Sequence, residues 1–324
     1  MQRLRTARCS ASWTIHLPER VEAATLGSVS LDLPELATID LDGPVRYRAW
    51  DGPRDVTFVL IHGLGGSHLN WVQVAPGLSG LGSVLALDLP GFGRSPRDGR
   101  GSGLMDERRI LSRFIAELAI GRVVLCGNSM GGGIAILQAA VEPASVAGIV
   151  LTSSVFPWSR GGLPHPVVLS AFAMYDAPVL GDRFARFRMR GMDAERAVRL
   201  GYRMVAADPR SIPEEIIRLN VELVRERQDD VDAADAFLDA ARSMLRLGKR
   251  PEIAARALDG VRCPVLVMHG RRDRFVPVAF AEAALARRPT WRGRIFPDLG
   301  HAPQMEAPGR WLSEVADWYA ELVG

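Results

Sequence analysis

The stretch VVLCGNSMGGGIAILQAAV, residues 123–141, decides which fold the chain is expected to adopt. Residues 123–126 are a short apolar run, typical of a strand buried on both faces of a sheet. Residues 130–141 are predicted to form a helix. Between them, residues 127–131 match G-x-S-x-G, whose glycines let a strand turn sharply into a helix and hold the serine out at the turn. Ser129 is therefore a candidate nucleophile at the carboxyl end of a buried strand.

Short apolar runs alternate with helical patterns on both sides of this stretch. Asp42-Gly43 predicts a hairpin between the first two strands. Buried strands that alternate with helices predict an α/β fold, with a mostly parallel sheet covered by helices on both faces. The expected strands are residues 37–41, 45–50, 56–61, 83–87, 123–126, 147–151, 265–269 and 294–296, and the expected helices are residues 110–118, 130–141, 278–286 and 311–322.

The alternation stops after Thr152 and resumes near residue 265. Residues 216–224 and 237–245 have the spacing of amphipathic helices, and the interval otherwise reads as helices and loops. We therefore expect an N-terminal arm at 1–34, a core made of 35–152 and 251–324, and a mainly helical cap at 153–250 inserted over one edge of the sheet.

Composition excludes several classes of protein. The chain has 324 residues, of which 48% are hydrophobic and 24% charged, as in ordinary globular proteins. A net charge of +3 produces only a weak electrostatic field. The sequence also lacks the dense stripe of basic residues with interleaved aromatics that would suggest binding to nucleic acid. No stretch approaches the roughly 20 apolar residues of a transmembrane helix. The sequence carries no signal for an oligomeric state.

Cysteine use and the N-terminus indicate a cytoplasmic protein. The 3 cysteines are sparse and odd in number, which does not suggest a disulfide framework and fits a reducing compartment. Residues 1–20 contain four arginines but lack the continuous apolar stretch of a secretory signal.

Two glycine-rich turns follow other predicted strands. HGLGG at 62–66 would leave backbone N–H groups free to point at a developing negative charge, and the N–H groups of Leu64 and Met130 are the expected pair of an oxyanion hole. His62 is interpreted as a structural turn residue. DLPGFGRS at 88–95 is interpreted mainly as a tight structural loop.

An aspartate and a histidine occupy the loops after the last two predicted strands. Asp273 lies in GRRDRFVP, just past the strand at 265–269, where open α/β sheets place their sites. His301 follows the last strand in a glycine-flanked loop. With Ser129, they give the chain order Ser, Asp, His that accompanies the G-x-S-x-G turn. No metal-ligand spacing and no nucleotide-binding glycine pattern is present, so no metal or cofactor is expected.

Five pieces in this order resemble the α/β-hydrolase superfamily: HGLGG, DLPGFGRS, GNSMGG, GRRDRFVP and GHAPQMEAP. The resemblance covers roughly residues 35–324, and the interval near 153–250 matches only as the family's variable cap. It implies a serine hydrolase in which Ser129 attacks a carbonyl carbon, His301 carries the proton and Asp273 orients the imidazole.

Several chemistries of the superfamily remain to be separated. Relatives that resemble dehalogenases and epoxide hydrolases use an aspartate nucleophile, and the serine at 129 argues against both. Hydrolysis of carboxylic esters through an acyl-enzyme is the leading expectation. The alternatives are hydrolysis of carbon–carbon bonds in vinylogous diketone ring-cleavage products, cofactor-free perhydrolase chemistry, and ligand binding without catalysis. GNSMGG favours carbon–carbon bond hydrolysis, whereas the short loop HGLGGS and Ala302 argue against it.

The cap is expected to select the substrate. Its 16 basic and 14 acidic residues between 156 and 250 nearly balance, so a small, mainly apolar ester is expected rather than a strongly charged substrate. Phe156, Trp158 and Met174 offer an apolar lining, and Trp71, just after HGLGG, is a candidate border of the acyl pocket, although packing would explain each of them as well.

Overall fold

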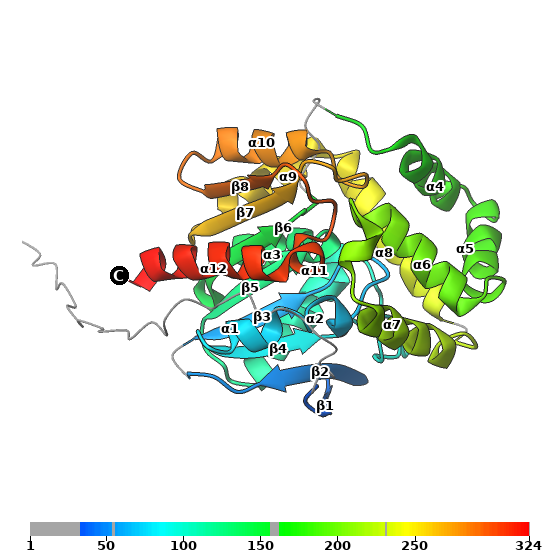
Figure 1. Cartoon of the computed structure of the whole chain (residues 1–324), viewed down its shortest axis with the longest axis horizontal. Helices are drawn as coiled ribbons and strands as arrows, with labels where there is room; N and C mark the ends of the chain where they lie inside the picture. Colours follow the sequence, from blue (N-terminus) through cyan, green and yellow to red (C-terminus); the bar gives the residue numbers. More distant parts are fainter. Residues whose placement is uncertain (1–32, 54–55, 156–161, 231, 324) are drawn as a thin grey trace, which may run out of the picture.

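The computed structural model describes residues 33–53, 56–155, 162–230 and 232–323. Its centre is an eight-stranded sheet in the order β1-β2-β4-β3-β5-β6-β7-β8 (Figure 1). Strands β1, β2 and β4 pair antiparallel, and every pair from β4 to β8 is parallel. The strands are β1 (Leu36–Asp40), β2 (Pro44–Trp50), β3 (Thr57–Ile61), β4 (Ser83–Leu87), β5 (Val123–Asn128), β6 (Val146–Thr152), β7 (Val265–Gly270) and β8 (Arg292–Phe296).

The predicted hairpin and mostly parallel sheet are confirmed. Residue Asp42 has a φ of 58° and Gly43 a φ of 124°. The Gly43 N–H donates to Asp40 Oδ1 at 2.8 Å, which closes the turn between β1 and β2. The last two residues of this three-residue loop therefore adopt a positive φ, which is common in tight hairpins.

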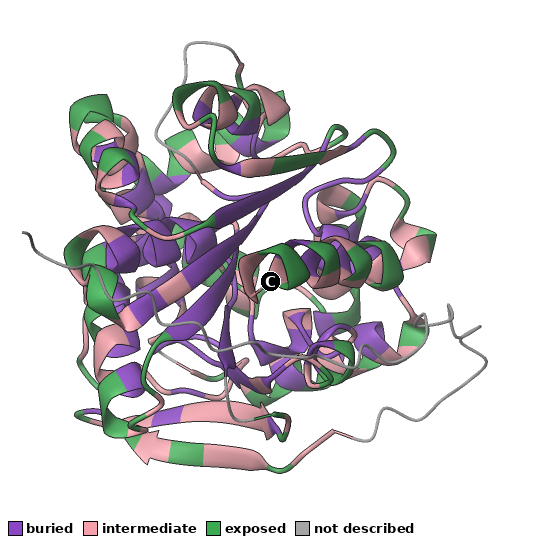
Figure 2. Cartoon of the chain, turned by 90° about the vertical axis from the view of Figure 1, so that its left-hand side faces the viewer, coloured by how far each residue is buried: buried purple, intermediate pink, exposed green. Residues whose placement is uncertain are grey.

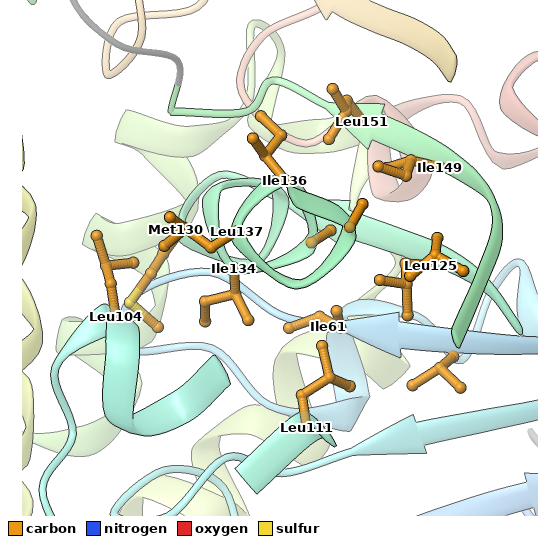
Figure 3. Close-up of a cluster of buried hydrophobic side chains, with 14 of the residues drawn as sticks. Ile61, Leu104, Leu111, Leu125, Met130, Ile134, Ile136, Leu137, Ile149 and Leu151 are labelled. Carbon is orange, nitrogen blue, oxygen red and sulfur yellow. The ribbon is translucent and has the colours of Figure 1, made fainter. Parts of the chain in front are cut away.

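Helices cover both faces of the sheet, because the central strands are apolar on both sides. Alternate residues of β3 to β7 enter two separate clusters of buried side chains, and the central strands are buried along their length (Figure 2). Figure 3 shows part of the first cluster, where Ile61 and Leu125 of the sheet meet Leu111 and Ile134 of two helices. The core helices are α1 (Ala75–Leu78), α2 (Leu104–Glu117), α3 (Met130–Val141), α9 (Pro251–Gly260), α10 (Val278–Arg287), α11 (Pro303–Glu306) and α12 (Pro308–Val323).

A helical cap is inserted between β6 and β7, as predicted (Figure 1). Two of its helices match the predicted segments at 216–224 and 237–245, and three more precede them. Within residues 162–230 and 232–250 the described chain contains no strand. The cap helices are α4 (Pro166–Asp176), α5 (Leu180–Arg190), α6 (Ala194–Val205), α7 (Glu214–Glu226) and α8 (Ala233–Gly248).

The cap has a small core of its own. Phe237, Leu238 and Ala241 of α8 are buried against Tyr175 of α4 and Ala185 of α5. The rings of Tyr175 and Phe237 meet edge-on with centroids 5.1 Å apart. Of the arm predicted at 1–34, residues 1–32 lie outside the described residues. None of the described helices is both long and apolar enough to cross a membrane.

We predict that Trp311→Ala will lower the free energy of unfolding by about 3–5 kcal/mol, because the side chain is fully buried and its removal leaves a cavity. The ring lies 5.9 Å from that of Trp71, and its indole N–H donates to Thr152 Oγ1 at 2.9 Å. Urea unfolding measures the change. Met105→Ala, on an exposed position of α2, is the matched control and should change the value by less than about 0.5 kcal/mol. Equal effects in the two variants would contradict the assignment.

Candidate active site

The turn between β5 and α3 places Ser129 in a strained backbone conformation. Its φ is 55° and its ψ is −116°, a region that side-chain-bearing residues rarely occupy. The neighbouring glycines are needed for close packing: a Cβ atom at Gly127 would collide with the Gly131 carbonyl, and one at Gly131 would collide with the Ile61 carbonyl. The G-x-S-x-G stretch therefore forms the sharp strand-to-helix turn that the sequence predicts.

The end of β6 holds this turn in place. The Ser129 N–H donates to the Thr152 carbonyl at 3.0 Å. The Ser129 carbonyl accepts from the N–H groups of Gly132, Gly133 and Val155 at 3.1, 3.3 and 3.1 Å. Because four backbone hydrogen bonds converge on one residue, the strained conformation is fixed by its surroundings.

The loop after β3 lies directly against the turn. A Cβ atom at Gly63 would be only 3.0 Å from the Ser129 Cβ, so the absence of a side chain there permits the approach. Within the described residues, the N–H groups of Leu64 and Met130 donate to no protein acceptor. Because β3 and β5 are parallel neighbours, Leu64, Ser129 and Met130 all follow the carboxyl edge of the sheet. Figure 3 shows Met130 at the start of α3.

His62 fixes this loop and is neutral. Its Nδ1 donates to the Gly63 carbonyl at 2.8 Å, and its Nε2 accepts from the Leu89 N–H at 3.1 Å. Burial lowers the pKa of His62 below its ordinary value, more than the nearby Asp88 carboxylate raises it. With both ring nitrogens engaged, His62 has the structural role that the sequence indicates.

Asp88 forms a buried pair with His68. Both side chains are fully buried, and the imidazole Nδ1 lies 2.9 Å from the carboxylate. The Arg94 N–H also donates to Asp88 at 2.8 Å. Burial would raise the pKa of Asp88, but the charge and hydrogen bonds of His68 hold it below the ordinary value. The carboxylate therefore organises the loop at 88–95.

The structure brings Asp273 and His301 together across the carboxyl ends of β7 and β8. Asp273 Oδ2 lies 2.7 Å from His301 Nδ1, and Asp273 Oδ1 accepts from the N–H groups of Phe275 and Val276 at 2.7 and 3.0 Å. Burial by itself would raise the pKa of Asp273, but His301 and His269 outweigh it and hold the pKa well below the ordinary range. The carboxylate is therefore ionised and fixes the Nδ1–H tautomer of His301.

The backbone of His301 is anchored on both sides. Its N–H donates to the Val205 carbonyl of α6 at 2.8 Å, and its carbonyl accepts from Asn128 Nδ2 at 3.1 Å. Asn128 immediately precedes Ser129, and its amide also donates to the Thr152 carbonyl at 3.0 Å. One amide side chain thus links the serine turn to the histidine loop.

Glu306 ties the histidine loop to the cap. Its carboxylate accepts from the N–H groups of Gly300 and Ala302 within the loop, and from that of Ala207, between α6 and α7, at 2.8 Å. Burial raises the pKa of Glu306, although these hydrogen bonds oppose the rise. The loop that carries Asp273 is also joined to the cap, since Arg274 Nη1 donates to the carbonyls of Arg203 and Ala206 at 2.9 Å.

Two aromatic side chains and a histidine near the site are absent from the sequence-based prediction. The Phe275 ring lies 4.9 Å from that of His301, and the Phe237 ring of α8 lies within 3.3 Å of the position that a Cβ atom would take at Gly65. His269 Nε2 lies 2.9 Å from the Val276 carbonyl and 3.3 Å from Asp273 Oδ2. His269 ends the strand run before GRRDRFVP, a position that could have identified it.

Of the four predicted substrate-binding residues, two are placed by the structure and two lie outside the described residues. Trp71 is fully buried among core side chains, where it packs against Trp311. Met174 is 39% exposed on α4. These positions do not favour substrate contact for either residue. Phe156 and Trp158 lie outside the described residues. Asp298, three residues before His301 in the sequence, forms an exposed pair with Arg310 at 2.6 Å.

The described residues contain no group of three His, Cys, Asp or Glu side chains arranged to hold a metal ion. The candidate site combines a serine, a paired histidine and carboxylate, and backbone N–H groups. Such a set is suited to nucleophilic attack on a carbonyl carbon, because it combines a nucleophile, a base and donors for an oxyanion.

Known sequences resemble this chain over most of its length. It is 28% identical over 268 residues to a dihydrolipoyllysine-residue acetyltransferase component of an acetoin cleaving system from Cupriavidus necator, covering 82% of this chain but 64% of that protein. A 2-hydroxy-6-oxononadienedioate/2-hydroxy-6-oxononatrienedioate hydrolase from Cupriavidus pinatubonensis is 28% identical, with 82% and 88% covered. A pimeloyl-[acyl-carrier protein] methyl ester esterase from Edwardsiella ictaluri is 29% identical, with 79% and 90% covered.

Solved structures share the fold. A putative lipase from Acinetobacter baumannii matches with a TM-score of 0.73 at 20% identity, covering 92% of this chain and 98% of that one. A meta-cleavage product hydrolase from Pseudomonas fluorescens matches with a TM-score of 0.71 at 20% identity, covering 90% and 99%. The model of the alpha/beta hydrolase family matches residues 58–315. With this match, the fold and the strained serine turn, the chain belongs to the alpha/beta hydrolase family.

Proposed function

We propose that the protein hydrolyses carboxylic esters of small, mainly apolar molecules, with Ser129, His301 and Asp273 as the catalytic triad. The observation that carries the proposal is the 2.7 Å contact between an ionised, buried Asp273 and His301 Nδ1. That contact leaves His301 Nε2 unprotonated in the neutral ring, which is the form that accepts a proton from a serine hydroxyl. The strained turn that presents Ser129 supports the same role.

In this mechanism Ser129 Oγ attacks the ester carbonyl carbon while His301 Nε2 takes its proton. The carbonyl oxygen becomes an oxyanion that accepts from the N–H groups of Leu64 and Met130, each typically worth about 3 kcal/mol in the transition state. The intermediate collapses, the C–O bond to the alcohol breaks, and His301 protonates the leaving oxygen. A water molecule then repeats the sequence on the acyl-enzyme, releasing the acid and restoring Ser129.

The cap, proposed here to span residues 153–250, supplies the surface that selects the substrate. Phe237 of α8 lies against the loop of Leu64, and Phe275 lies beside the His301 ring. Aromatic rings thus lie next to two loops that carry proposed site residues, which favours an uncharged acyl group. Phe156 and Trp158 stay predictions for the same surface. A cytoplasmic location stays a prediction from the sparse cysteines, of which Cys126 and Cys263 carry free thiols.

Carbon–carbon bond hydrolysis of vinylogous diketones is the second candidate. The 28% identical relative named for hydrolysis of 2-hydroxy-6-oxononadienedioate favours it, over 82% of this chain. The same nucleophile, base and oxyanion donors would serve both reactions. Only a comparison of ester and diketone substrates can therefore distinguish the two activities.

We predict that Ser129→Ala lowers ester turnover by a factor on the order of 10⁶, because the nucleophile is lost while the fold remains. Purified protein is assayed with a panel of acyl esters and one vinylogous diketone, and labelled with a fluorophosphonate. Ser170→Ala, at an exposed position of α4, is the matched control and should keep full turnover. Labelling of Ser129→Ala at another serine would refute the triad, whereas preferred cleavage of the diketone would establish the second candidate.

We predict that Asp273→Asn lowers stability in a pH-dependent way. The native pKa of Asp273 is lowered, so the carboxylate stabilises the fold fully above the unfolded pKa of about 3.9, and the contribution is lost as the pH falls through the native value. The difference in free energy of unfolding between wild type and variant should therefore be largest above about pH 5 and narrow below about pH 4. Urea unfolding across this range measures it.

Asp298→Asn is the control for this measurement, because its exposed pair with Arg310 should contribute less than about 1 kcal/mol at any pH. The Asp273 variant should also lose turnover by a factor on the order of 10⁴, as for the equivalent change in another triad enzyme. A difference in stability that stays constant with pH would mean that Asp273 is not ionised in the native protein.

We predict that His269 positions Asp273. His269→Phe removes a donor near Asp273 Oδ2, so the carboxylate can rotate away from His301 and kcat should fall about ten- to hundredfold, by analogy with the outer partners of metal-bound histidines. KM should change little because His269 is buried away from solvent. His269→Gln, which keeps a side-chain donor, should recover part of kcat. A rise in KM alone, or no rescue, would contradict a positioning role.

A further inference from the structure

Large exposed apolar side chains are concentrated in one part of the cap. Among the described residues ten such side chains are exposed, and eight of them lie between Leu163 and Leu200. Phe187 is 68% exposed, Leu180 59% and Val167 56%. Globular proteins usually scatter such residues singly, and a concentration of them marks an interaction surface. The cap therefore presents a contact surface that packing within the described chain does not cover.

The packing of α4 and α5 directs their exposed residues away from the body. Both helices contact α8, and the side chains that reach it include Phe172 and Tyr175 from α4 and Phe184 and Ala185 from α5. Their opposite faces are therefore free, and α5 lies at the end of the molecule farthest from the C-terminus (Figure 1). We define the α4–α5 outer face as Val167, Met174, Leu180, Arg183, Phe187 and Arg190.

The charge of this face is positive. Asp176 and Asp182, the acids of the two helices, are paired with Lys249 at 2.8 Å and with Arg242 at 3.1 Å. Within the described residues Arg183 and Arg190 have no ion-pair partner, and both are exposed. Leu180, Arg183, Phe187 and Arg190 recur at intervals of three and four residues, so apolar and cationic side chains share one side of α5.

We propose that the α4–α5 outer face docks on the surface of an anionic phospholipid bilayer. Phe187, Leu180 and Val167 would enter the boundary between headgroups and acyl chains, while Arg183 and Arg190 pair with lipid phosphates. A symmetric dimer is disfavoured, since a two-fold interface would bring two copies of this positively charged face together. Docking leaves the chain outside the bilayer core, and it does not rest on the proposed esterase activity.

Vesicle co-sedimentation of the full chain tests the proposal. Phosphatidylcholine vesicles are compared with vesicles that also contain phosphatidylglycerol. Binding should require the anionic lipid and weaken with added salt. Leu180→Ser with Phe187→Ser, and separately Arg183→Glu with Arg190→Glu, should each weaken binding at least about tenfold, given about 1 kcal/mol per basic residue at a lipid surface.

Val141→Ser and Arg256→Glu are matched controls, since both positions are exposed outside the cap, and they should bind as wild type. Far-UV circular dichroism and thermal unfolding verify that each variant is folded. Absence of binding to anionic vesicles, or equal loss in the controls, would overturn the proposal. So would light scattering that shows a dimer which the outer-face variants dissociate, because the face would then bind a second copy.

Discussion

The strained backbone of Ser129 is the constraint on which the rest of the site depends. A residue with a side chain holds a φ of 55° here because β6, the segment just after it and α3 supply four hydrogen bonds to its backbone. Those bonds require β5 and β6 to be adjacent and parallel, and the close approach of β3 requires glycine at 131. The central sheet therefore acts as the rigid support that orients a single hydroxyl.

The loop that carries His301 is hydrogen-bonded to both the core and the cap. Asn128 joins its backbone to the serine turn, whereas Val205 and Glu306 join it to the end of α6 and to the segment that follows. Movement of that segment would shift His301 relative to Asp273, because the loop has a hydrogen bond on each side. The cap thus contacts the loop of the proposed base, and a cap surface seated on lipid would be connected to the site through the same segment.

Two His–Asp pairs show why tertiary context is needed to assign a role. His68 Nδ1 lies 2.9 Å from the Asp88 carboxylate, almost as close as in the proposed catalytic pair, but both side chains are fully buried. Asp273 and His301 have similar geometry at the carboxyl edge of the sheet, and His301 is slightly exposed. The chain order of motifs predicts that Asp273 and His301 are the catalytic pair, because the G-x-S-x-G turn predicts where its partners lie.

The sequence alone determined the sheet, the hairpin, the helical insertion and the loops that carry Ser129, Asp273 and His301. These depend on local patterns: apolar runs, Asp42-Gly43 and glycines that permit one turn geometry. Tertiary structure alone decided the roles of His269, Asn128, Glu306 and Phe237, since their partners lie far away in sequence or on another element. It also decided that Trp71 packs in the core and that Met174 is exposed, because a side chain's surroundings depend on which helix covers it.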